Sequence, residues 1–134
     1  MTGLILKLGP RERVLINGAV IENGDKRSRL AIKTPDAKIL RLKDAIHPEE
    51  ATTPVRRACF ATQLVLTGDS TAADAKLQIL RRIEELSRVL TDHDSRAQLD
   101  LATAAVTENQ YYKCLKALRT LLPREERLLA TRLQ

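Results

Sequence analysis

Lysine and arginine are the residues of this chain whose placement most clearly predicts a chemical function. They recur at alternate positions within short runs of apolar residues, and alternate side chains of a β-strand point to the same side of a sheet. We therefore expect a basic face that binds the phosphates of a polyanion, most simply RNA. The candidate RNA-binding residues are Lys7, Arg29, Lys33, Arg41 and Lys43, followed along the chain by Arg56 and Arg57.

The net charge of +6 is concentrated in the N-terminal part of the chain. Residues 1–57 contain 12 Lys and Arg against 7 Asp and Glu, whereas residues 58–134 contain 11 against 10. A basic surface that only aids solubility explains the charge equally well. No aromatic residue precedes Phe60, so RNA contacts in this part would use charge, backbone groups and apolar edges rather than stacked bases.

The residue types that usually carry catalysis or bind metals are few and isolated. Cys59 and Cys114 show no CxxC spacing, and we expect two buried free thiols. His47 and His93 have no partner at metal-ligand spacing and fit turn or surface positions. Neither a glycine-rich phosphate loop nor a GxSxG motif occurs. The sequence therefore predicts no catalytic residues, no metal site and no cofactor, and a protein that is not an enzyme.

Short β-like runs separated by turn signals must position the cations. Asn17-Gly18 lies between apolar alternations and predicts a type I′ hairpin, and Asn23-Gly24 predicts a further turn. In the last run, Leu40 and Leu42 are expected to face the core, with Arg41 pointing outward beside Ile39 and Lys43. We expect the leucines of three strands to share one side, and the cations to share the other.

Helical spacing dominates the remainder of the chain. The apolar run 58–66 fits a helix better than a strand, and further helices are expected at about 72–90, 95–106, 109–122 and 124–133. The predicted class is α+β: a small antiparallel sheet in a basic module, residues 1–57, followed by a helical hairpin or bundle, residues 58–134. The candidate residues for a protein partner lie on one helix: Tyr112, Lys113, Lys116 and Arg119.

Three segments resemble the FlbT family of small regulators of flagellin expression: residues 9–27 (GPRERVLINGAVIENGDKR), 49–64 (EEATTPVRRACFATQL) and 109–126 (NQYYKCLKALRTLLPREE). The resemblance implies post-transcriptional control through the 5′ untranslated leader of flagellin messenger RNA. It implies repression of translation or promotion of decay, although some members act as activators. It also implies action beside a second small protein, FlaF.

The N-terminal part is also similar, at the level of the fold, to the CsrA family of translational regulators, which are small intertwined β dimers. The similarity rests on LILKLGPRE at residues 4–12 and LRLKDAI at residues 40–46. It places Leu6 and Lys7 on the first strand and Lys43 near the end of the last. That family has an arginine where Lys43 stands, and lysine does not make the same bidentate contacts.

Two functions remain open from the sequence, beside a self-associating scaffold. The chain is a regulator that binds the flagellin leader directly, or it is a protein adaptor whose helical part binds FlaF or flagellin and affects the messenger indirectly. A small β-rich half also favours pairing of edge strands into a homo-oligomer. We expect a cytoplasmic protein, because no apolar run approaches the ~20 residues that span a membrane and no secretory signal is apparent.

Overall fold

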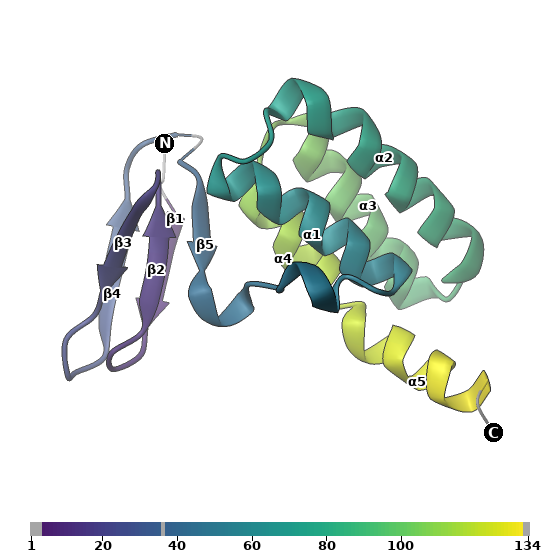
Figure 1. Ribbon diagram of the computed structural model, residues 1–134, viewed down its shortest axis with the longest axis horizontal. Helices are drawn as coiled ribbons and strands as arrows, with labels where there is room; N and C mark the ends of the chain where they lie inside the picture. The colour runs from purple at the N-terminus through teal and green to yellow at the C-terminus, as the bar shows by residue number, and fades with distance from the viewer. Residues whose placement is uncertain (1–3, 36, 133–134) are drawn as a thin grey trace.

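A computed structural model describes residues 4–35 and 37–132, with the strands at one end of the molecule and the helices at the other (Figure 1). The predicted α+β class is confirmed. The strands are β1 (Leu4–Leu8), β2 (Arg13–Ile16), β3 (Ala19–Glu22), β4 (Ser28–Ile32) and β5 (Ile39–Arg41). Two 3-10 turns follow, η1 (Leu42–Asp44) and η2 (Pro48–Glu50). The helices are α1 (Pro54–Thr67), α2 (Ala72–Val89), α3 (His93–Thr107), α4 (Tyr111–Arg119) and α5 (Leu122–Arg132).

The predicted hairpin at Asn17-Gly18 is confirmed and joins β2 to β3. Both turn residues have positive φ, 48° at Asn17 and 86° at Gly18, as a type I′ turn requires. Asn17 also exchanges hydrogen bonds with Lys38: its N–H donates to the Lys38 carbonyl at 2.8 Å, and its Oδ1 accepts from the Lys38 N–H at 2.9 Å. The turn therefore also fixes the start of β5.

The strands form two sheets rather than one. β1 pairs with β4 in an antiparallel two-stranded sheet, and β3, β2 and β5 form a second antiparallel sheet in that order. The sheets share a buried apolar cluster made by Leu6, Leu8, Val14 and Ile39. The expectation of one basic face built from three strands of a single sheet is therefore wrong, because β5 pairs with β2 and not with β1 or β4.

The predicted sides of β5 are also wrong at Ile39, which was expected to point outward, and at Leu42, which follows the strand. Ile39 is buried in the cluster between the sheets, whereas Leu40 is buried in the core of the helices. Leu42, expected to face the core, is 37% exposed. The strand ends at Arg41 and the chain turns into η1, so the period of two stops one residue before Leu42. A strand between two cores buries both of its faces, which an amphipathic pattern cannot predict.

Helix α1 is the centre of the helical part and packs against α2, α4 and β5. It begins at Pro54, four residues before the apolar run that predicted it, because the Thr53 side chain caps it by accepting from the Arg56 N–H. Its first turn therefore includes residues 54–57, which the sequence grouped with the basic module. It ends at Thr67, and Gly68 follows as the C-cap with a φ of 86°, the left-handed conformation typical of that position.

Helix α5 extends away from the other helices in Figure 1 and is anchored near its start. The buried Glu125 carboxylate accepts from the Val55 N–H at 2.8 Å and from the Thr53 hydroxyl, so it holds the N-terminus of α1. Leu128 and Leu129 further along the helix are exposed. None of the helices described here is long and apolar enough to span a bilayer.

Candidate nucleic-acid interface

A cavity of about 360 Å³ lies where β5 and η1 meet α4. These elements are far apart in the sequence, and they come together because β5 packs against α1 of the helical part. The cavity contains four cationic side chains, and we call it the basic cleft. Its lining residues are Arg41, Lys43, Asp44, Tyr112, Leu115, Lys116 and Arg119.

Arg41 is held firmly at the inner side of the basic cleft. Its Nη1 donates to Glu12 Oε2 at 2.7 Å, and its Nε donates to the Tyr112 hydroxyl at 3.3 Å. The side chains of Arg41 and Glu12 are only 16% and 12% exposed. Arg41 therefore joins the sheet to α4, and its charge is already balanced by a carboxylate.

The environment keeps both members of this ion pair charged. Burial alone would raise the pKa of Glu12, but hydrogen bonds from the Gly9 N–H and Arg41, with the nearby charges of Arg41 and Lys43, outweigh it and lower that pKa. Burial would lower the pKa of Arg41, but contacts with the Tyr112 hydroxyl and Glu12 outweigh it and raise that pKa. The pair therefore stays ionised at neutral pH.

The second arginine of the basic cleft is also bound to its own chain. Arg119 Nη1 donates to the Asp44 carbonyl at 2.8 Å, and its Nη2 lies 3.5 Å from Asp44 Oδ1. The two lysines are freer. Lys43 is exposed, with its Nζ 3.9 Å from Glu12 Oε2, and Lys116 is exposed and forms no ion pair within the described chain. Four cations against two carboxylates leave the cleft positive, with lysines facing the solvent.

The candidate RNA-binding residues of the sequence fall into separate groups. Arg41 and Lys43 line the basic cleft, whereas Lys7 and Arg29 lie directly opposite each other on β1 and β4. Lys33 follows β4 and is exposed. A hollow of about 420 Å³ on the two-stranded β1–β4 sheet is lined by Lys7 and Arg29 together with Arg27, Leu8, Gly9, Pro10 and Ser28. We call Lys7, Arg27 and Arg29 the outer basic patch.

Arg56 and Arg57 join neither group, because they occupy the first turn of α1 and line neither hollow. Arg27 was missed by the sequence reasoning. Its only signal was the Lys26-Arg27 pair, which precedes the alternation that predicted β4.

The structure also unites residues that the sequence assigned to different partners. Tyr112, Lys116 and Arg119 were candidates for a protein partner, yet they line the same cleft as Arg41 and Lys43. The signal available in the sequence was a helix that carries cations at every third position from Lys113 and has no acidic residue. This spacing of cations does not indicate that the cationic face of α4 lies beside β5.

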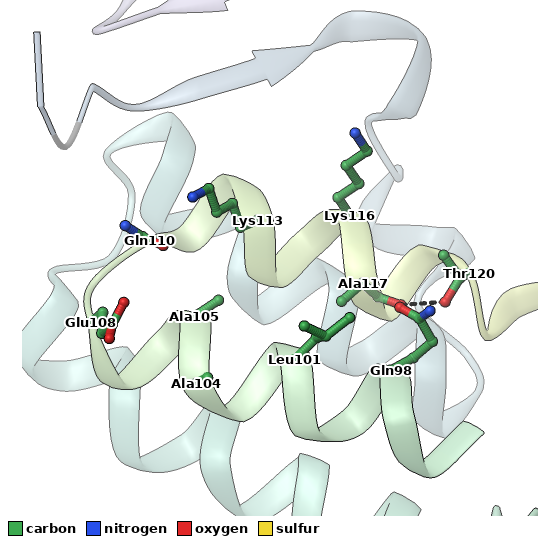
Figure 2. A pocket seen from close by; sticks show the side chains of 10 residues that line it. All are labelled: Gln98, Leu101, Ala104, Ala105, Glu108, Gln110, Lys113, Lys116, Ala117 and Thr120. Atoms are coloured by element: carbon green, nitrogen blue, oxygen red, sulfur yellow. Dashed lines mark hydrogen bonds between the residues drawn. The ribbon is translucent and has the colours of Figure 1, made fainter. Parts of the chain in front are cut away.

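A third depression, of about 440 Å³, runs between α3 and α4 and is shown in Figure 2. Its floor is apolar and made largely of small side chains: Ala104, Ala105 and Ala117. Leu101 lies over this floor and is 58% exposed. Lys113 and Lys116 extend from α4 away from α3, so Lys116 borders both this α3–α4 groove and the basic cleft. Polar residues complete the lining: Gln98, Glu108, Gln110 and Thr120.

The isolated thiols and histidines give no further site. Cys59 and Cys114 are buried and free, as expected, and burial raises the pKa of each to about 12. His47 is the N-cap residue of η2, and its backbone N–H donates to Glu50 Oε1 at 2.9 Å. Within residues 4–35 and 37–132, no three His, Cys, Asp or Glu side chains come together as metal ligands.

Comparisons with known proteins agree over nearly the whole chain. The family model described as flagellar protein FlbT matches residues 4–129. The probable flagellum biosynthesis repressor protein FlbT of Rhodopseudomonas palustris (strain TIE-1) is 35% identical over 127 residues, 95% of this chain and 98% of that protein. The corresponding protein of Caulobacter sp. (strain K31) is 32% identical over 126 residues, 94% and 95% of the two chains.

The flagellum biosynthesis repressor protein FlbT of Caulobacter vibrioides (strain ATCC 19089 / CIP 103742 / CB 15) is 30% identical over 123 residues, 92% of this chain and 86% of that protein. These names describe repressors and no enzymatic activity. No solved structure matches the chain, and the similarity of its strands to the CsrA family stays a prediction. A match that includes both the sheets and the helices shows that this chain belongs to the FlbT family.

Proposed function

We propose that this chain represses flagellum biosynthesis by binding the 5′ leader of flagellin messenger RNA, and that the basic cleft contacts the RNA. The names of its relatives support the repressor role. The observation that carries the RNA contact is the convergence of four cations from β5, η1 and α4 around one cavity. Binding to the leader would block access of the ribosome or promote degradation of the messenger RNA.

The proposed binding mode gives the arginines and lysines different tasks. Arg41 and Arg119 are bound by Glu12 and Asp44, so they fix the shape of the cleft. Lys43 and Lys116 are exposed on flexible stems and contact the phosphates. Tyr112 is the only aromatic residue of the lining and is half-buried, so charge rather than stacked bases provides the affinity.

A binding assay with the leader RNA tests this proposal. The double variant Lys43→Ala, Lys116→Ala removes two exposed cations from the cleft. Loss of two phosphate contacts is expected to weaken binding about tenfold or more at moderate salt. The matched control is Arg81→Ala, Arg96→Ala, which removes two exposed cations from α2 and α3, away from the cleft. Equal affinities of the two double variants would contradict the proposal.

The α3–α4 groove supports a second candidate function, that of a protein adaptor for FlaF or flagellin. Its apolar floor and the exposed Leu101 suit the apolar face of a partner helix. Leu101→Glu places a charge in the groove at an exposed position. Loss of FlaF or flagellin from RNase-treated pull-downs, with leader binding unchanged, would favour the adaptor. Unchanged pull-downs would count against it.

A further inference from the structure

The outer edge of β3 is exposed, and Glu22 is the one charged residue of this strand. β3 pairs with β2 only, and all four of its residues are exposed, with Val20 61% and Ile21 39% accessible. Proteins usually protect such edges with lysine, proline, a bulge or a covering segment. The other edge strands in the described chain, β1, β4 and β5, each carry a lysine or an arginine, whereas β3 carries neither and has no proline.

The hydrogen-bonding pattern shows which backbone groups of β3 are free to pair. Asn23 N–H donates to the Glu12 carbonyl at 2.8 Å, just beyond the β2–β3 ladder. Because antiparallel strands use the groups of alternate residues, Ile21 and Ala19 also bond to β2. The N–H and C=O groups of Val20 and Glu22 therefore point away from β2, toward the free edge.

We propose that a second copy of this chain pairs with β3, antiparallel and about a two-fold axis that passes Ile21. In this register the free groups of Val20 meet those of the partner's Glu22, and the reverse, which gives four ladder hydrogen bonds. Ile21 lies opposite the partner's Ile21 as a non-hydrogen-bonded pair, in which the side chains are closest. The two short sheets become one continuous six-stranded sheet.

The charges of the edge are compatible with this register. Glu22 is held by its own chain, with Oε1 2.9 Å from Arg13 and Oε2 3.3 Å from Arg11, and it faces the partner's Val20. A shift that set Glu22 against the partner's Glu22 would oppose two carboxylates, which is unfavourable. If the two-fold axis passed Val20 instead, Val20 would face the partner's Val20, and only this one pair of residues within the strand would form ladder hydrogen bonds. The pairing about Ile21 is therefore the most favourable.

Disulfide crosslinking tests both the pairing and its register. A non-hydrogen-bonded antiparallel pair has Cα atoms about 4.5 Å apart, within the range of a disulfide. Ile21→Cys is expected to form a crosslinked dimer under mild oxidation. Val20→Cys is expected to crosslink far more slowly, because its counterpart lies two positions away along the partner strand. Val89→Cys, exposed on α2, is the control, and the buried Cys59 and Cys114 do not compete.

Light scattering provides a second test on the unmodified protein. Its mass is expected to rise with concentration toward twice the 15.0 kDa of one chain. Val20→Pro removes an outward N–H that β2 does not use, so the hairpin persists. The N–H of Val20 in each copy donates one hydrogen bond across the interface, so the variant loses two hydrogen bonds. We expect this loss to raise the dissociation constant of the dimer about tenfold. The mass of one chain at all concentrations, or crosslinking of Val20→Cys as fast as Ile21→Cys, would overturn the proposal.

Discussion

Replacement of Arg41 by alanine is expected to destabilise the fold, although this residue lies in the proposed RNA cleft. The Arg41 guanidinium neutralises Glu12 at 2.7 Å, and both side chains are largely buried. Without it, the carboxylate keeps the hydrogen bond from the Gly9 N–H at 3.0 Å and the more distant Lys43. The variant also loses the contact between Arg41 and Tyr112, which connects the sheet to α4.

The size of the effect follows from the exposure of the pair. Exposed ion pairs contribute about 0–1 kcal/mol, whereas removal of one partner of a fully buried pair costs about 3–5 kcal/mol. A pair at 16% and 12% exposure lies between these cases, and a hydrogen bond to a charged group contributes about 1.5–3 kcal/mol. We expect a loss of about 2 kcal/mol for Arg41→Ala. With a urea dependence of about 2 kcal/mol per molar, the midpoint falls by about 1 M.

Urea unfolding followed by far-ultraviolet circular dichroism measures this loss. Lys116→Ala is the matched control, since Lys116 lines the same cleft but is exposed and forms no ion pair in the described chain. Its midpoint is expected to stay within about 0.25 M of wild type. In the double variant with Glu12→Ala, the added loss from Arg41→Ala should be small, because no unpaired carboxylate remains. An Arg41→Ala midpoint equal to that of wild type would refute the structural role of the pair.

Three further results are expected. Because the pKa of Glu12 is lower in the folded state, this residue contributes stability above its unfolded pKa of about 4.5, and the contribution is lost as the pH falls through the folded pKa. Glu12→Gln should therefore reduce the dependence of the unfolding free energy on pH in this acidic range. An unchanged dependence would contradict the ion pair. Cys59 and Cys114, with pKa values near 12, should resist iodoacetamide at about pH 8 in the native state and react after unfolding; rapid native labelling would show them accessible. Glu125→Ala should cost about 1–3 kcal/mol in urea unfolding, because it leaves the buried Val55 N–H and the half-buried Thr53 hydroxyl at the α1 N-terminus without their acceptor. An unaltered midpoint would exclude this role.

The elements defined by local signals could be predicted from the sequence. Asn17-Gly18 predicted the β2–β3 hairpin because positive φ at two successive residues is a local requirement. The helix expected from about residue 72 begins at Ala72, because the Thr71 side chain caps it by accepting from the Asp74 N–H. The apolar stripe of α2 includes Ile79, Ile83 and Leu86, all buried. Each of these signals lies within a few residues of the element it specifies.

Long-range arrangement could not be predicted in the same way. The pairing of β1 with β4, and of β2 with β5, depends on which apolar faces meet across loops, and alternation gives sides but not neighbours. Lys7 and Arg41 were therefore assigned to one face although they lie in different sheets. Arg41 was expected to point outward toward RNA. Its ion pair with Glu12 joins residues 29 positions apart, and no local pattern in the sequence predicts such a pair. The cleft itself needs α4 beside β5, which is a property of the tertiary fold.

The most direct measurement for the central claim is the salt dependence of binding to the flagellin leader RNA. Each phosphate contact on a single strand contributes about 0.7 to the slope of log affinity against log salt. Lys43→Ala, Lys116→Ala is therefore expected to reduce the magnitude of the slope by about 1.4, while Arg81→Ala, Arg96→Ala leaves it unchanged. Identical slopes for wild type and both variants would show that the basic cleft does not bind the transcript.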